Sequence, residues 1–325
     1  MSAQLSVDGL IARYKADSLQ PVTPALRALT ERLVVPHVDE IIRDMLELRM
    51  NTDRHFASRA AQGAVKGDEG LSADPAKYPL SFCLEITRHM LAQMSREPAP
   101  AHMTGLRALH EFVRAGGAIK RVWGALRGGY FQNAIQVGSY YLDVANDTVD
   151  PKKIKVEMLA LSQSNFNNLG SFFEFAGVAR HYWKCQIIPN RYFPNLAPYF
   201  PAILFDKDGS MRFESRNTYL FPMNLHKNFQ PARDYVMDDN MSLVILEPLI
   251  ERLKRHAARD GRMAQRDHWM WFCADADEDL RTRFETVRNL NKAELTRAIS
   301  KVLSADIEFN PNFDRMDDPR RDKWQ

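Results

Sequence analysis

Among the side chains that could carry chemistry, the thiol of Cys83 has the most suggestive position. It lies at the start of an expected helix, in the sequence YPLSFCLEITRHML, directly behind a loop rich in glycine and proline. The first turn of a helix presents unpaired N–H groups and the positive end of the helix dipole, and both favour a thiolate over a thiol. The position of Cys83 therefore predicts a nucleophilic cysteine.

Other catalytic and metal-binding signatures do not occur in the sequence. There is no GxxxxGK[ST], GxGxxG, HExxH or CxxC pattern, so phosphate-loop, dinucleotide-binding and zinc sites lose their usual sequence support. The one His-x-Asp triplet, His37–Asp39, lies in a helical stretch and does not favour a non-haem iron site. We therefore expect no cofactor and no metal.

A predicted β-hairpin follows Cys83 by about fifty residues, in YFQNAIQVGSYYLDVANDTVD. Its second strand ends in Asp143. Together with the helix that starts at Cys83, this arrangement resembles the transglutaminase and deamidase branch of the papain-like superfamily. In that branch a cysteine at a helix start faces a His on one strand and an Asp on the next, in a pattern like GxC…HAWLEVxGxxYIDVTxD. The resemblance covers about residues 78–150.

The resemblance implies roles for particular residues. Cys83 takes the position of the nucleophile and Asp143 that of the orienting acid, while Gln132 or Asn133 stands where the family has its His. Gln132 would then be an oxyanion donor or a placeholder. Ser81 replaces a glycine that is frequent near the cysteine. The implied chemistry is acyl transfer from a glutamine or peptide-type amide in a protein or peptide.

The missing His leaves three interpretations of Cys83 open, because neither amide side chain can accept the thiol proton. Cys83 can be a small buried apolar residue, as most free cysteines are. The fold can be retained around an inactive site that serves as a binding module. Alternatively, an active enzyme can draw its base from elsewhere, with His102, His110 or His181 as candidates.

A run of prolines and aromatic residues at 189–201 suggests a non-enzymatic alternative, a binding or assembly protein that uses this surface and the carboxy-terminal helices. On either interpretation, the side chains expected to contact a substrate or partner are aromatic. They are Trp123, Tyr192, Phe193 and Tyr199.

Acidic and amide side chains cluster directly after the second strand of the hairpin. Asn and Asp favour turns at such positions, and a divalent cation is the alternative. The cluster comprises Asp143, Asn146, Asp147 and Asp150.

The hydrophobic periodicity predicts the elements that position these residues. Helices are expected at 24–62 with a break at Pro36, and at 80–96, 104–115, 166–182, 241–258 and 278–304. Strands are expected at 118–124, 132–137, 140–144 and 185–188, with a hairpin at 205–213. The fold class is α+β, with a helical amino-terminal region, a small mainly antiparallel sheet and a helical carboxy-terminal part. The expected regions are 1–75, 76–235 and 236–325.

Composition limits the class of protein further. With 45% hydrophobic and 26% charged residues the chain is globular, and a net charge of +3 does not favour nucleic acid as a partner. No window of membrane-spanning length is free of charge. The amino terminus lacks the pattern of a leader, and three scattered cysteines do not form a disulfide framework. We therefore expect a cytoplasmic protein without a membrane partner.

Overall fold

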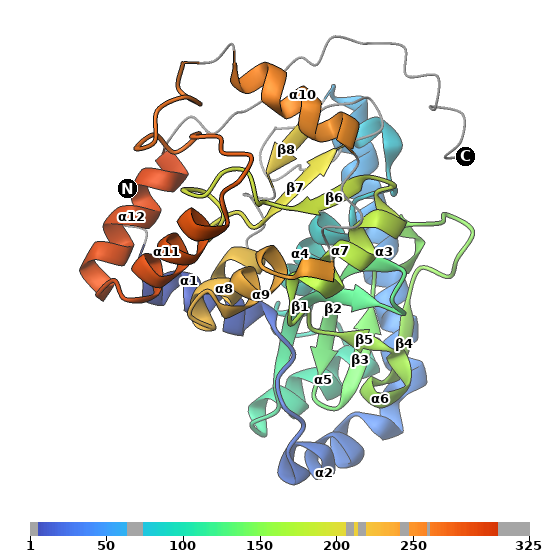
Figure 1. Cartoon of the computed structure of the whole chain (residues 1–325). Helices are drawn as coiled ribbons and strands as arrows, with labels where there is room; N and C mark the ends of the chain where they lie inside the picture. Colours follow the sequence, from blue (N-terminus) through green and yellow to red (C-terminus); the bar gives the residue numbers. More distant parts are fainter. Residues whose placement is uncertain are drawn as a thin grey trace. The chain divides into compact units, whose positions relative to one another are not determined.

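The computed structural model describes residues 6–63, 74–205, 211–213, 219–240, 247–258 and 261–304. The chain forms two compact units, shown in Figure 1. Unit 2 is the continuous segment 15–168, and unit 1 combines residues 1–14 with 169–325. All residues of the expected thiol site lie in unit 2.

Unit 2 begins with helices that the sequence defines clearly. Helix α2 (Pro24–Leu33) has Thr23 as its N-cap, whose hydroxyl accepts a hydrogen bond from the backbone N–H of Leu26 at 3.2 Å. A short 3₁₀ turn η1 (Val35–His37) contains Pro36 and separates α2 from the long helix α3 (Val38–Ala61). A second 3₁₀ turn, η2 (Pro75–Lys77), precedes α4 (Cys83–Met94) and α5 (Thr104–Arg114).

The sheet of unit 2 has five antiparallel strands in the order β4-β3-β2-β1-β5. Gly138 lies in the tight β2–β3 turn with φ +58, where an added Cβ would approach Thr30 Oγ1 to 2.2 Å. This contact sets the turn directly against α2. The strands are β1 (Ile119–Leu126), β2 (Tyr130–Val137), β3 (Tyr140–Asp143), β4 (Glu157–Ala160) and β5 (Phe166–Asn167).

The two faces of this sheet carry different residues, because side chains alternate along a strand. The helical face carries Ile135, Val137 and Leu142, which join the apolar side of α3, α4 and α5 in the main core of the unit. The opposite face carries Ala134 and Tyr141 in a smaller apolar cluster. The short elements η3 (Asn146–Thr148) and α6 (Leu161–Ser164) lie before and after β4.

Unit 1 combines helices with a small antiparallel sheet in the order β6-β7-β8. Its core is rich in aromatic side chains, several of them in edge-to-face contact, such as Phe193 and Phe213 with ring centroids 5.2 Å apart. Its strands are β6 (Gln186–Pro189), β7 (Ala202–Phe205) and β8 (Met211–Phe213). Its helices are α7 (Phe172–Tyr182), α8 (Leu220–His226), α9 (Gln230–Val236), α10 (Glu247–Ala257), α11 (Asp277–Arg288) and α12 (Lys292–Ser304). Helix α1 (Val7–Asp17) spans the boundary between the units.

The structure confirms the α+β class, with helices before and after antiparallel sheets. It differs from the sequence interpretation in several elements. In the helix expected at 166–182, the first two residues form strand β5 and the helix α7 begins at Phe172. The single helix expected at 278–304 is divided into α11 and α12. The strands expected at 205–213 pair as β7 and β8, while the tip of that hairpin and residues 241–246 lie outside the described residues. Helices α1, α8 and α9 and strand β4 were not expected.

The boundary between the units falls after Asn168, inside the segment 76–235 that was expected to be one core. The helices of 1–75 do not form a region of their own, because α2 and α3 supply much of the apolar core of unit 2. In the part of the chain that is described, no helix has both the length and the apolar character needed to cross a bilayer.

Candidate thiol site

Cys83 is the first residue of α4, as the sequence predicts. The chain turns into this helix at Ser81, which has φ +66, a left-handed conformation that glycine adopts most easily. The backbone N–H of Ser81 donates to the carbonyl of Thr148 at 3.0 Å. This bond fixes the start of the helix against the loop that follows β3.

The sulfur of Cys83 lies against strand β2, where Asn133 Nδ2 donates a hydrogen bond to Sγ at 3.4 Å. Arg121 on β1 holds the other end of the amide, because its Nη1 donates to Asn133 Oδ1 at 2.7 Å. Asp17 in turn accepts from Arg121 Nη2 at 2.6 Å. A guanidinium can only donate, so the amide oxygen must face Arg121 and the amide nitrogen must face the sulfur.

The setting of Cys83 favours the thiol over the thiolate. Burial raises the pKa of the Cys83 thiol, and hydrogen bonds from Asn133 oppose this change only in part. The helix start therefore does not give the lowered pKa that the sequence suggested. Among the described residues, no histidine nitrogen hydrogen-bonds to this sulfur.

Asp143 belongs to a different cluster. Its Oδ2 accepts from Gln132 Nε2 at 2.8 Å and from the Tyr141 hydroxyl at 3.0 Å, and its Oδ1 accepts from the backbone N–H of Ala145 at 2.8 Å. Burial raises the pKa of Asp143 to about 6, although all three donors act to lower it. Gln132 Oε1 is also buried and finds no hydrogen-bond partner in the described structure.

The register of the sheet explains why these residues form two clusters. Asn133 alternates with Gln132 along β2, so their side chains project to opposite faces. Asn133 shares the helical face with Ile135 and meets Cys83, whereas Gln132 shares the opposite face with Tyr141 and Asp143. Of the two amides expected at the position of the His, Asn133 is the one that contacts Cys83, whereas Asp143 orients Gln132. The acid therefore orients an amide, but not the amide that contacts the thiol.

The three histidines proposed as an alternative base have other surroundings. His102 is exposed and lies 3.2 Å from Glu47. His110 is buried on α5, with Nε2 2.7 Å from the carbonyl oxygen of Met94. His181 lies on α7 in unit 1. His102 and His110 are thus engaged away from Cys83.

The aromatic residues expected to bind a substrate or partner divide between the two units. Trp123 pairs with Asn133 across β1 and β2 and stacks on Phe131 with ring centroids 5.3 Å apart, so it is half-buried on the helical face near the thiol. The others lie in unit 1 with 5% or less of their surface exposed, and the prediction of an aromatic–proline binding surface is wrong. These buried residues are Tyr192, Phe193 and Tyr199.

The acidic cluster after β3 has a structural role. Asp147 forms a buried two-point ion pair with Arg49 of α3, with N–O distances of 2.7 and 3.2 Å, and Lys155 adds a contact at 3.1 Å. Arg49 also contacts Asp53 at 3.0 Å. The described residues contain no group of three or more His, Cys, Asp or Glu arranged to hold a metal ion.

Sequence reasoning missed two residues that shape these sites, Arg121 and Arg49. Arg121 stands two positions before Trp123 on the same strand, so strand periodicity could have placed it on the face of Asn133. No local pattern marks Arg49, which looks like one of several arginines on a long amphipathic helix. No protein-family model, curated protein or solved structure matches the chain.

Proposed function

We propose that unit 2 is a non-catalytic binding module, built on the plan of a cysteine acyl-transfer enzyme in which the base has been replaced by an amide. The observation that carries this proposal is the hydrogen bond from Asn133 Nδ2 to Cys83 Sγ at 3.4 Å. An acyl-transfer cysteine needs a neighbouring group that removes the thiol proton and returns it to the leaving group. The Asn133 amide donates to the sulfur and cannot accept that proton.

Two further observations support the loss of catalysis. Arg121 holds the Asn133 oxygen at 2.7 Å, so rotation of the amide would leave a guanidinium facing an N–H₂ group. Asp143 lies in the cluster on the opposite face, where its carboxylate is occupied by three donors. Neither Asn133 nor Asp143 is therefore placed to accept the proton of the Cys83 thiol.

The test compares the three cysteines of the intact protein. The full chain is treated with iodoacetamide near neutral pH, and the labelling rate of each cysteine is followed by mass spectrometry of its peptides. Cys83 and Cys273 are both half-buried, whereas Cys185 is buried. Cys83 should react more slowly than Cys273, because desolvation raises the pKa of the Cys83 thiol and lowers its thiolate fraction. If Cys83 reacts fastest, the thiol is activated and the proposal fails.

A second assay addresses acyl transfer itself. A glutamine-containing peptide is incubated with the protein and hydroxylamine, and hydroxamate formation is measured for the wild type and for Cys83→Ala. Equal background signals are expected from both proteins, because the Asn133 amide beside the sulfur donates a hydrogen bond and cannot accept the thiol proton. Hydroxamate that depends on Cys83 would show that the module is an enzyme.

A further inference from the structure

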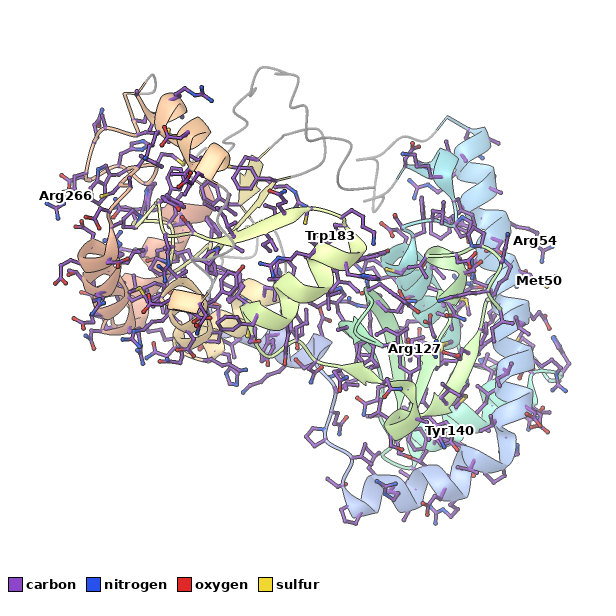
Figure 2. The ribbon with its side chains drawn as sticks, turned by 45° about the vertical axis from the view of Figure 1, so that its right-hand side comes forward. Met50, Arg54, Arg127, Tyr140, Trp183 and Arg266 are labelled. Carbon is purple, nitrogen blue, oxygen red and sulfur yellow. The ribbon has the colours of Figure 1, made fainter. Side chains whose placement is uncertain are left out.

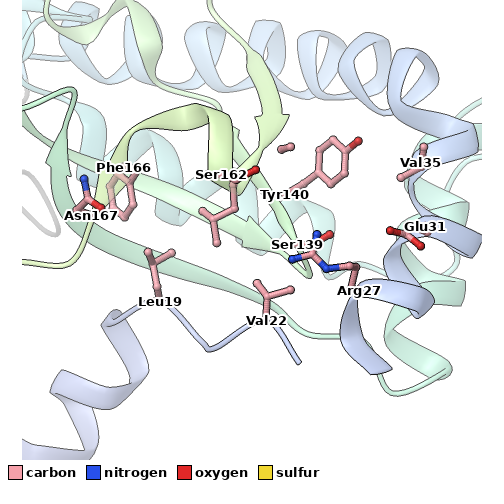
Figure 3. Close-up of a pocket in the computed structure, with 12 residues that line it drawn as sticks. Leu19, Val22, Arg27, Glu31, Val35, Ser139, Tyr140, Ser162, Phe166 and Asn167 are labelled. Atoms are coloured by element: carbon pink, nitrogen blue, oxygen red, sulfur yellow. The ribbon is translucent and has the colours of Figure 1, made fainter. Parts of the chain in front are cut away.

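Unit 2 contains a pocket of about 470 Å³ that the thiol site does not use. It lies between α2, the β2–β3 turn and the stretch from α6 to β5, as Figure 3 shows. Its volume is within the range of pockets that hold small molecules. Leu19, Val22, Leu161 and Phe166 give it an apolar wall.

Six polar side chains line this pocket; Ser139 and Tyr140 are half-buried and the other four are exposed to solvent. Among the described residues, none of the six forms a side-chain hydrogen bond or an ion pair. The six are Arg27, Glu31, Ser139, Tyr140, Ser162 and Asn167.

Arg27 and Glu31 are the informative pair. They stand four residues apart on α2, a spacing at which opposite charges can pair along a helix. They do not form an ion pair with each other, and both line the pocket. Figure 3 shows the Arg27 side chain directed toward the turn at Ser139. One positive and one negative group, about one helical turn apart, therefore border the same apolar wall.

We propose that this pocket binds a free α-amino acid with an apolar side chain. The carboxylate of such a ligand would accept hydrogen bonds from Arg27 and from the hydroxyl at Ser139, while its ammonium group would donate to Glu31. Its side chain would cover Leu19, Val22 and Phe166. The inference deepens the proposed function, because it names the ligand class of the binding module.

Calorimetric titration of the full chain tests the pocket, with L-leucine and L-phenylalanine as probes. Two analogues test the charged groups of the ligand separately. Phenylalaninamide lacks the carboxylate, and N-acetylphenylalanine lacks the ammonium group. Each analogue should bind at least about tenfold more weakly than phenylalanine, since each leaves one charged partner unpaired. Equal binding of either analogue would overturn the proposal.

Variants on α2 identify the site. Arg27→Gln and Glu31→Gln should each weaken binding about tenfold or more, whereas Arg32→Gln should leave it unchanged, because Arg32 is exposed on the same helix and does not line the pocket. Absence of binding for both amino acids, or unchanged binding in the first two variants, would refute the pocket assignment. A reactive Cys83 with intact binding would refute only the proposed loss of catalysis.

Discussion

The side chain at position 133 determines what the thiol of Cys83 can do. An imidazole beside a thiol can accept its proton, and the resulting cation then stabilises the thiolate. An amide supplies only a neutral donor, and in this protein that donor does not overcome the burial that raises the pKa of Cys83. The helix-start cysteine and the adjoining strand therefore lie together without an imidazole between them.

Asn133→His should restore part of that coupling. The imidazole would stand beside the Cys83 sulfur on the helical face and lower the thiol pKa, and a pKa lower by one should accelerate iodoacetamide labelling near neutral pH about tenfold. Cys273 in the same molecules provides the internal reference. An unchanged ratio of the two rates, in a variant that keeps the circular dichroism of the wild type, would mean that position 133 does not control the thiol.

Asp143 predicts a specific pH dependence of stability. Its folded-state pKa is raised from 3.8 to about 6, so the carboxyl stabilises the fold fully below the unfolded pKa, and this contribution is lost as the pH rises through about 6. A pKa difference of about two corresponds to about 3 kcal/mol. In urea unfolding measured from pH 4 to pH 7, the free energy of unfolding of the wild type should therefore include a decrease that is missing in Asp143→Asn. Parallel curves for the two proteins would contradict the raised pKa.

The sequence placed Cys83 at a helix start and Asp143 at a strand end, and both positions are confirmed. It could not decide between Gln132 and Asn133, because a shift of one residue exchanges the two faces of a strand. That choice depends on the pairing of β2 with β1 and β3, which is set by contacts distant in sequence. The sequence thus predicted the helix and the strand that carry Cys83 and Asp143, but not which amide side chain contacts each of them.

Helix α3 joins the rest of unit 2 through a charged side chain as well as an apolar face. Arg49 is fully buried and links α3 to the carbonyl of Val144 at 3.2 Å and to Asp147 in the loop after β3. Figure 2 shows Met50 and Arg54 on the same helix; both side chains are exposed, whereas that of Arg49 is buried. A buried charge that loses its partner is far more costly than a surface charge that does.

Arg49→Met should therefore destabilise the protein by about 3–5 kcal/mol, since it leaves the carboxylate of Asp147 buried with only Lys155 as counter-ion. Arg54→Met on the same helix is the matched control and should change the free energy of unfolding by less than about 0.5 kcal/mol. The double variant Arg49→Met, Asp147→Asn should recover part of the loss. Equal effects of the two arginine variants in urea unfolding would exclude the buried pair as a determinant of stability.

Local signals were sufficient for some elements and not for others. The Thr23-Pro24 start of α2 and the break at Pro36 depend only on neighbouring residues, and both are confirmed. Strand β4 follows a polar stretch and has four residues, so it gives too short a pattern to be recognised. It exists because β3 offers it a partner strand, a fact that only the tertiary fold supplies.

The division of the molecule into units was the least predictable feature. Unit 1 is discontinuous in sequence: Tyr14, from its amino-terminal segment, lies 5.0 Å from Tyr219 between ring centroids. Unit 2 ends at Asn168, where the sequence has neither a linker composition nor a change of charge. A domain boundary that no linker marks can be found only from the packing on either side of it.

The packing predicts how fragments of the chain behave. Residues 15–168 contain the five-strand sheet together with α2 and α3, whose apolar residues complete the core on its helical face. This fragment should fold by itself and unfold cooperatively in urea, as a domain with its own core does. Residues 76–235, the core region suggested by the sequence alone, lack α2 and α3 and should not unfold cooperatively. Circular dichroism and gel filtration of the two fragments decide between the boundaries, and a compact 76–235 beside an unstructured 15–168 would show that the core is divided differently.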